Sequence, residues 1–402
     1  MSPLAKMAGQ PWLSAWNKAA ATVTIAASWL VVRLAMTVVV DPVISGDQTA
    51  YVAAAREFVA TDGAVLARRS PGYVLFLAST LWLGPHATYA AQSLITLAAA
   101  ILTQRRLGFW QGLAHAACPF FVIWEWALLT ETLCLNALWS GWLLLFSKRP
   151  WTSFAGALLV GIAILSRPLL MLLPLFVAPL VVLRLSKRGA FASMAVMYLP
   201  VALALSQASG PSYFGVNLWI GTWERDPHWL EGPHTSWPEE AQLTASERNL
   251  PLLTAAQNDA PYIEAAKVRY ETRPLSSLGS WFARYPYLWI GTRTASVSLE
   301  PHAPGWLAYK GSMWILNMSV LLLGCAGAFL ALRRRDRERS LLLPIAYVAI
   351  IYVPFHNTET RYSVIALPFL LALGIYFCGG LLGGRRNPRH RAVGALPDAP
   401  AT

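Results

Sequence analysis

Charged residues are scarce in this sequence of 402 residues. Lys, Arg, Asp and Glu make up 13% of the chain, whereas hydrophobic residues make up 56%. An ordinary soluble domain carries about 25% charged residues, so this chain has too little charge to cover the surface of one aqueous globule. The scarcity excludes a soluble globular protein and predicts an integral membrane protein.

Cysteine is also rare, and the positions of the four cysteines exclude two kinds of site. Cys118, Cys134, Cys325 and Cys378 all lie in apolar segments, and their spacing is not that of metal ligands. We therefore expect neither a disulfide framework nor a zinc site. Internal repeats and a Gly-rich phosphate loop after a strand are absent as well.

Long apolar runs are abundant, and runs of about 17 to 25 residues are typical of membrane spans. The 18 Trp and 14 Tyr are typical of chains with aromatic residues at two membrane interfaces. The sequence predicts an all-α, polytopic membrane helix bundle of about ten spans, the first of them a retained signal anchor. The expected spans are Trp16–Val40, Thr88–Thr103, Gly108–Ala127, Leu129–Phe146, Ser153–Leu165, Leu169–Leu183, Phe191–Gln207, Ser312–Leu332, Leu341–Phe355 and Tyr362–Leu382.

The net charge of +12 is explained by the expected membrane topology. Short basic clusters separate the spans, which is the positive-inside pattern and assigns them to the cytoplasm. No nucleic-acid partner is therefore expected. The chain divides into a transmembrane module 1–207 with a first extracytoplasmic loop at 41–87, an extracytoplasmic region 208–310, transmembrane helices 311–384 and a cytoplasmic tail 385–402. The clusters are Arg105-Arg106, Lys148-Arg149, Arg184 with Lys187-Arg188, Arg333 to Arg339, and Arg385 to Arg391.

Several shorter helices are expected at the extracytoplasmic surface. Tyr73–Leu83 and Tyr287–Leu299 are apolar, but we interpret them as interfacial or re-entrant, because counting the first as a span would reverse the side of Arg105-Arg106. An amphipathic helix is predicted to follow Ser45, with Gln48 completing a capping box. Further helices are predicted at 238–249 and 260–272.

Two acids are candidates for chemistry on the outer face. Asp47 lies at the start of the amphipathic helix, where backbone N–H groups favour an anion, and an ionised carboxylate there can act as a general base. Simple stabilisation of the helix N-terminus is the alternative. Glu131 lies between two spans near membrane depth, where ionisable groups are costly and usually functional; a solvated turn is the alternative. Glu125 is a weaker candidate.

Arginines collect on the same predicted face. Arg167 lies in a tight outer turn, Arg68 and Arg69 precede another turn, and Arg361 opens the last span. Guanidinium groups match the oxygens of a lipid phosphate; interfacial snorkelling is the alternative. His356 is a possible acid or donor, although a lone histidine is more often structural.

Six short segments, taken together, resemble the GT-C superfamily of glycosyltransferases, in particular the branch of protein O-mannosyltransferases and aminoarabinose transferases. Each is short, but their order and spacing cover nearly the whole chain. The segments are Gly46-Asp47-Gln48 with Tyr51, Arg69-Ser70-Pro71-Gly72-Tyr73, Leu129-Thr130-Glu131-Thr132-Leu133, Leu165-Ser166-Arg167-Pro168, Ala283-Arg284-Tyr285-Pro286-Tyr287-Leu288 and Glu359-Thr360-Arg361-Tyr362.

The resemblance implies a GT-C type bundle in the inner (cytoplasmic) membrane that transfers a sugar, with inversion, from a polyprenyl-phosphate donor to a glycan, lipid or protein acceptor at the periplasmic or exterior face. It implies Asp47 as the base and Glu131 as a second catalytic acid. Many members carry a second acid where this chain has Gln48, which leaves dependence on Mg²⁺ or Mn²⁺ open. The arginines implied to bind the donor phosphate are Arg167, Arg361, Arg68 and Arg69, and the other expected substrate contacts are Tyr51, Tyr73, His356, Glu359 and Tyr362.

Two other classes of function remain alternatives. A transporter or flippase would need polar residues deep within facing spans or inverted repeats; the sequence shows neither beyond Arg33 and Glu125. A non-catalytic membrane scaffold would explain the long outer region but not acids and arginines spread over five loops.

Overall fold

The computed structural model describes residues 11–37, 47–61, 70–147, 149–207, 218–219, 222, 260–291, 305–355 and 360–382. Within these ranges the regular structure is helical and no strand occurs. The helices are α2 (Pro11–Thr37), α3 (Asp47–Ala60), α4 (Pro71–Thr80), η1 (Leu81–Leu83), α5 (Pro85–Leu107), α6 (Phe109–Ala117), α7 (Pro119–Glu125), α8 (Glu131–Leu145), α9 (Pro150–Ser166), η2 (Pro168–Leu170), α10 (Leu173–Arg184), α11 (Lys187–Gln207), α14 (Ala260–Thr272), α15 (Pro274–Trp289), α16 (Trp306–Arg334), η5 (Arg337–Leu341), α17 (Leu342–Phe355), η6 (Thr360–Ala366) and α18 (Leu367–Leu382).

Three helical segments in the described residues are both long and apolar enough to cross a membrane: Asn17–Thr37, Trp306–Arg334 and Tyr362–Leu381. Shorter apolar helical segments occur at 71–83, 150–166 and 168–184. The prediction of an all-helical protein suited to a membrane is therefore confirmed for the described part of the chain. The arrangement of about ten spans stays a prediction.

One expected span is not a single continuous helix. The run Gly108–Ala127 is divided into α6 and α7 at Cys118, whose backbone is extended with φ −69° and ψ 113°. Pro119 explains the break, because its ring disfavours helical backbone in the residue before it. Since α7 ends at Glu125, the chain reaches α8 through a non-helical segment, Trp126–Thr130, which we call the 126–130 loop.

The surface helices lie where the sequence places them. Helix α3 buries Gln48, Tyr51 and Ala55 and exposes Arg56, so it has one packed face as expected for an amphipathic helix. Helix α4 has 10 residues and extends for about 15 Å, which is too short to cross the hydrocarbon layer. Helix α14 coincides with the predicted 260–272 helix, whereas the predicted 238–249 helix lies outside the described residues.

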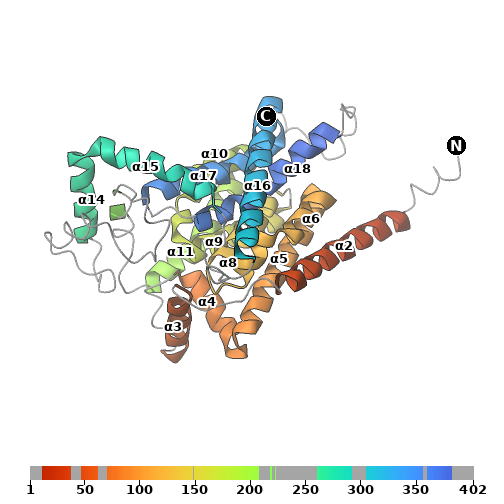
Figure 1. Ribbon diagram of the computed structural model, residues 1–402, viewed down its shortest axis with the longest axis horizontal. Coiled ribbons are helices and arrows are strands. Elements are labelled where there is room, and N and C mark those ends of the chain that lie inside the picture. The colour runs from red at the N-terminus through yellow and green to blue at the C-terminus, as the bar shows by residue number, and fades with distance from the viewer. Residues whose placement is uncertain are drawn as a thin grey trace.

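The centre of the bundle is formed by α8, α9, α11 and α18 (Figure 1). A four-residue connection, 146–149, joins α8 to α9, and the two helices pack against each other along their length as an antiparallel hairpin. A second cluster of buried apolar side chains joins α3, α4 and α7 to α16 and α18. Helix α2 projects away from the bundle and contacts it through α5, α6 and α7. The hairpin brings the start of α8 beside the residue that follows α9.

Candidate functional site

A buried ion pair joins the start of α8 to the residue that follows α9, at the open end of the α8–α9 hairpin. Arg167 Nη1 lies 3.0 Å from Glu131 Oε1, and the side chains of Arg167 and Glu131 are 8% and 4% exposed. Glu131 lies in the first turn of α8, where the helix dipole favours a carboxylate. Arg167 ends α9 because Pro168 follows it and its own backbone is extended. Two residues predicted from separate loops therefore meet.

The Arg167 guanidinium is also held from a third element. Its Cζ atom lies 4.9 Å from the centroid of the Tyr362 ring, within the range of a cation–π interaction. Arg167 Nη1 also donates to Thr130 Oγ1 at 3.5 Å. Tyr362 belongs to η6, which packs on α8, and Arg361 precedes it in the same helix. The backbone of Arg361 therefore lies one residue from the ring that covers Arg167.

The start of α3 is attached to the same region through Gln48. Its Oε1 accepts a hydrogen bond of 2.7 Å from the backbone N–H of Leu128, in the 126–130 loop. Gln48 is buried and Asp47, the preceding residue, is half-buried. Asp47 is the first residue of α3, so its carboxylate lies at the positive end of the helix. One loop thus separates the start of α3 from Glu131.

Helix α4 lies against the turn that carries Arg167. A Cβ atom added at Gly72 would lie 2.8 Å from Leu165 Cβ and 2.9 Å from Ser166 N, so only glycine allows this approach. The Tyr73 ring meets the Tyr51 ring edge-on with centroids 5.3 Å apart. The predicted segments around Tyr51, Gly72 and Ser166 are therefore in contact.

Tyr73 links α4 to the 126–130 loop from a second direction. Its hydroxyl donates to Gln92 Oε1 at 3.0 Å, and Gln92 Nε2 donates to the backbone carbonyls of Glu125 and Ala127 at 2.6 and 3.1 Å. Burial, and secondarily the charge of Glu131, raise the pKa of Tyr73 well above its usual value. Tyr73 is therefore a neutral hydrogen-bond donor in this site.

The fifth segment, on α15, reaches the site through η6. Ser363 Oγ donates a hydrogen bond of 2.5 Å to the backbone carbonyl of Leu288. Contacts therefore link five of the six segments, and the remaining one, on α15, bonds the residue that follows Tyr362. Four predicted residues lie outside the described part of the chain, and so does the side chain of a fifth, Arg361. The four are Arg68, Arg69, His356 and Glu359.

A second buried ion pair was not predicted. Arg33 of α2 binds Glu125 through both Nε, at 3.0 Å from Oε2, and Nη2, which contacts Oε1. Ser93 Oγ donates to Glu125 Oε2 at 2.7 Å, and Arg33 Nη1 donates to the Ala116 carbonyl at 2.5 Å. The signal was present in the sequence, because one cation and one acid inside apolar runs tend to pair. Glu125 is therefore engaged as a structural partner of α2.

Helix α5 carries more buried polar side chains than we expected when we argued against a transporter from the sequence. Each of them has a hydrogen-bond partner within the described residues. Asn136 Nδ2 donates to Thr96 Oγ1 at 3.0 Å, and Trp139 Nε1 donates to Thr103 Oγ1 at 2.7 Å. Asn136 Oδ1 lies 3.1 Å from a ring nitrogen of His115. These groups join α5, α6 and α8 to one another.

Metal ligands do not gather at this site within the part of the chain that is described. No group of three or more His, Cys, Asp or Glu occurs there. At the position of the expected second acid, Gln48 binds Leu128, and Glu131 is neutralised by Arg167. The described donor set does not fit a divalent cation, so no metal-dependent step is derived.

In comparisons with known proteins, no family model, no curated protein and no solved structure matches the chain. The class that the described residues define is a helical protein with three helices suited to a membrane and a buried acid–arginine pair at one end of its central hairpin.

Proposed function

We propose that the chain is a membrane glycosyltransferase of the GT-C type. It transfers a sugar, with inversion, from a polyprenyl-phosphate donor to a glycan, lipid or protein acceptor. The reaction takes place at the extracytoplasmic face of the cytoplasmic membrane, in a bundle of about ten spans whose basic loops face the cytoplasm. The proposal retains the topology expected from the basic clusters.

The observation that carries the proposal is the contact between Glu131, Arg167 and Tyr362. These residues come from three segments of the suspected family pattern and are far apart in sequence. Burying an acid and an arginine together at the end of a membrane hairpin is costly, and such residues often mark functional sites. The attachment of α3 to the same loop through Gln48 adds Asp47 to this end of the bundle.

Asp47 is the proposed general base. Its carboxylate takes the proton from an acceptor hydroxyl as the acceptor oxygen forms a bond to the anomeric carbon. The bond between that carbon and the phosphate oxygen breaks on the opposite side of the sugar. Both electrons of this bond leave with the polyprenyl phosphate, and the configuration at the anomeric carbon is inverted.

Arg167 is the proposed cation for the leaving phosphate. Fixed cations stabilise negative charge that grows in the transition state, and they do so most where water is excluded. Glu131 contacts Arg167 directly, so we assign it the role of a positioning residue that holds the guanidinium in place. Arg361, Arg68 and Arg69 are further proposed phosphate ligands, on chain segments that adjoin Tyr362 and Ser70.

The wall for the polyprenyl chain is proposed along α4. This helix is apolar, short and seated beside Arg167 through Gly72. Leu75 is 41% exposed and Trp82, in η1 just after α4, is 76% exposed, so this segment presents apolar side chains outward. A lipid lying along this face would place its phosphate near the start of α4.

Sugar transfer from a radiolabelled polyprenyl-phosphate donor in proteoliposomes tests the proposal. We expect Asp47→Asn to lower turnover by about 100-fold or more, as for loss of a general base. Glu57→Gln is the matched control, because Glu57 lies on the exposed side of the same helix. It should transfer sugar at nearly the wild-type rate.

Two results would overturn the proposal. One is near-normal turnover by the Asp47→Asn protein with unchanged helical content, which removes Asp47 as the base. The other is transfer from a nucleotide sugar when no lipid-linked donor is present, which removes the donor class.

A further inference from the structure

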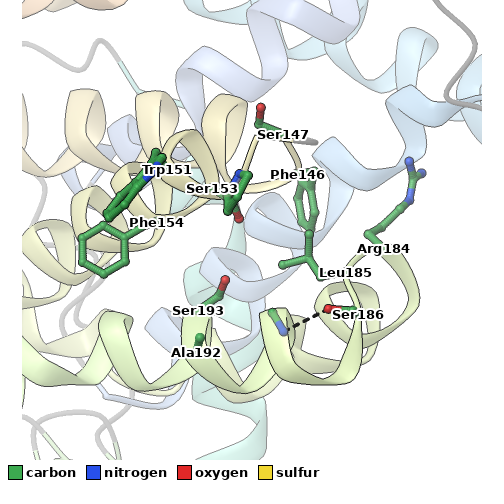
Figure 2. A pocket seen from close by; sticks show the side chains of 12 residues that line it. Phe146, Ser147, Trp151, Ser153, Phe154, Arg184, Leu185, Ser186, Ala192 and Ser193 are labelled. Carbon is green, nitrogen blue, oxygen red and sulfur yellow. Dashed lines mark hydrogen bonds between the residues drawn. The ribbon is translucent and has the colours of Figure 1, made fainter.

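A pocket of about 720 Å³ opens at the other end of the α8–α9 hairpin (Figure 2). It lies between the α8–α9 connection, with the first turns of α9, and the α10–α11 connection, with the first turns of α11. Helix α9 separates it from Arg167 by about 25 Å, given 1.5 Å for each of 17 residues. The pocket is therefore distinct from the Glu131–Arg167 site, and a ligand bound in it would be independent of the proposed sugar transfer.

The pocket exists because α9 and α11 meet closely at one level and separate toward their first residues. A Cβ atom added at Gly161 would lie 2.8 Å from the Met197 carbonyl oxygen and 3.0 Å from Pro200 Cγ. Nearer the first turn of α9, Ser153 Oγ donates to the Leu145 carbonyl at 2.5 Å and holds α9 against α8. The space between α9 and α11 is left open at this end.

A serine hydroxyl on α11 is open to this space. Ser193 is 6% exposed, lines the pocket, and makes no side-chain hydrogen bond within the residues the structure describes. Figure 2 shows its hydroxyl pointing from α11 toward α9. A hydroxyl in this position can both donate and accept a hydrogen bond across the pocket. The hydroxyl therefore marks a place for a hydrogen-bonding ligand.

The electrostatic environment of the pocket favours an anion. Arg184, in the last turn of α10, lines it. Arg149 is exposed on the α8–α9 connection, and Lys187 and Arg188 are exposed in the first turn of α11. Helices α9 and α11 both begin here, so both direct the positive ends of their dipoles to this side. Ser186 Oγ accepts the Gly189 N–H at 3.2 Å and caps the start of α11.

The opposite side of the pocket is aromatic. Trp151 and Phe154 line it from α9 and are 82% and 45% exposed, and Figure 2 shows them across the pocket from Arg184. Two further large apolar side chains next to the pocket residues, Leu183 and Phe191, are 81% and 79% exposed. A soluble anion would leave these surfaces in water, whereas a lipid would cover them with its acyl chains.

We propose that this pocket binds the phosphate headgroup of an anionic phospholipid of the leaflet that faces the basic loops. The phosphate lies at the Ser193 hydroxyl, Arg184 turns toward it from the border of the pocket, and the acyl chains pass Trp151 and Phe154 into the bilayer. A volume of about 720 Å³ suits a headgroup with the first part of its chains.

Lipid binding to the purified full-length chain tests this inference. The detergent-solubilised protein is titrated with phosphatidylglycerol and, separately, with phosphatidylcholine, and retained lipid is counted by native mass spectrometry. Arg184→Gln should weaken phosphatidylglycerol binding by about tenfold or more, as for loss of a charged hydrogen bond, and Ser193→Ala by roughly fivefold. Ala192→Trp keeps every charge but fills the pocket and should abolish retention. Arg106→Gln, an exposed arginine outside the pocket, should bind as the wild type does.

Each outcome decides the inference. A preference for phosphatidylglycerol that weakens in Ser193→Ala, weakens further in Arg184→Gln and is lost in Ala192→Trp supports it. Equal retention by wild type, Arg184→Gln and Ala192→Trp would show that the lipid binds elsewhere on the protein surface. Equal retention of the two lipids, or complete displacement by inorganic phosphate at the lipid's own concentration, would also overturn it. Because Ser193→Ala only removes one hydroxyl, it keeps the test valid if the larger Trp disturbs folding.

Discussion

Replacing Glu125 by alanine should strongly destabilise the protein. The change removes the acceptor for Arg33 Nε and Nη2 and for Ser93 Oγ. It leaves the Arg33 side chain, which is 7% exposed, without its acid partner. The remaining polar contacts of Arg33 among the described residues are two backbone carbonyls and the Trp29 ring, whose centroid lies 5.2 Å from Arg33 Cζ. Breaking a buried pair by removing one partner costs about 3 to 5 kcal/mol. We expect a loss of this size in the free energy of unfolding.

The measurement is unfolding in mixed micelles with increasing SDS, followed by loss of helical circular dichroism. The double variant Arg33→Met with Glu125→Leu removes both charges together, and apolar replacement of a buried pair is often close to neutral. It should therefore be more stable than Glu125→Ala alone. Glu57→Ala, an exposed acid on α3, should change stability by less than about 0.5 kcal/mol.

The reasoning is refuted by either of two results. If Glu125→Ala costs no more than the exposed control, the pair is not a buried structural link. If the costs of Arg33→Met alone and Glu125→Leu alone add up to the cost of the double variant, Arg33 and Glu125 do not interact energetically.

Three further predictions concern the Glu131–Arg167 site and the segments that hold it. Glu131→Gln should raise the KM for the lipid donor more than it lowers kcat, and the conservative variant Glu131→Asp should recover part of the lost activity. If the Glu131→Gln protein has wild-type stability and wild-type kinetics, Glu131 does not position Arg167. Arg167→Lys keeps the positive charge but loses the planar guanidinium with its paired N–H donors, so the rate of sugar transfer should fall by about tenfold or more while the helical content stays normal. Gly72→Ala should cost about 1 to 3 kcal/mol of stability through overpacking, whereas Gly279→Ala, at a position with open space, should have little effect in the same SDS titration.

The meeting of Glu131 and Arg167 was predictable in outline from the sequence. The basic clusters predict which loops share a face, and a four-residue connection at 146–149 makes α8 and α9 an antiparallel hairpin. These two facts place the start of α8 beside the end of α9. The direct ion pair between Arg167 and Glu131 needed the structure.

The other contacts between segments distant in sequence could not be predicted from the sequence. Gln48 was expected to complete a capping box with Ser45, which lies outside the described residues; its side chain accepts a hydrogen bond from Leu128, 80 residues away. Gly72 carries no periodic signal for its close approach to Ser166, because that approach depends on how α4 leans on α9. The division of 108–127 at Cys118 could have been read from Pro119, but the uninterrupted apolar composition favoured one span.

The length of α9 sets a fixed spacing between the two ends of the central hairpin. Its 17 residues measure about 25 Å, somewhat less than a hydrocarbon layer of about 30 Å. In the proposed bundle, where α9 crosses the membrane, lipids with longer acyl chains would draw one end of α9 below the headgroup layer, and shorter chains would let both ends reach water together. Sugar transfer and phospholipid retention should therefore both depend on bilayer thickness, with an optimum in thin membranes.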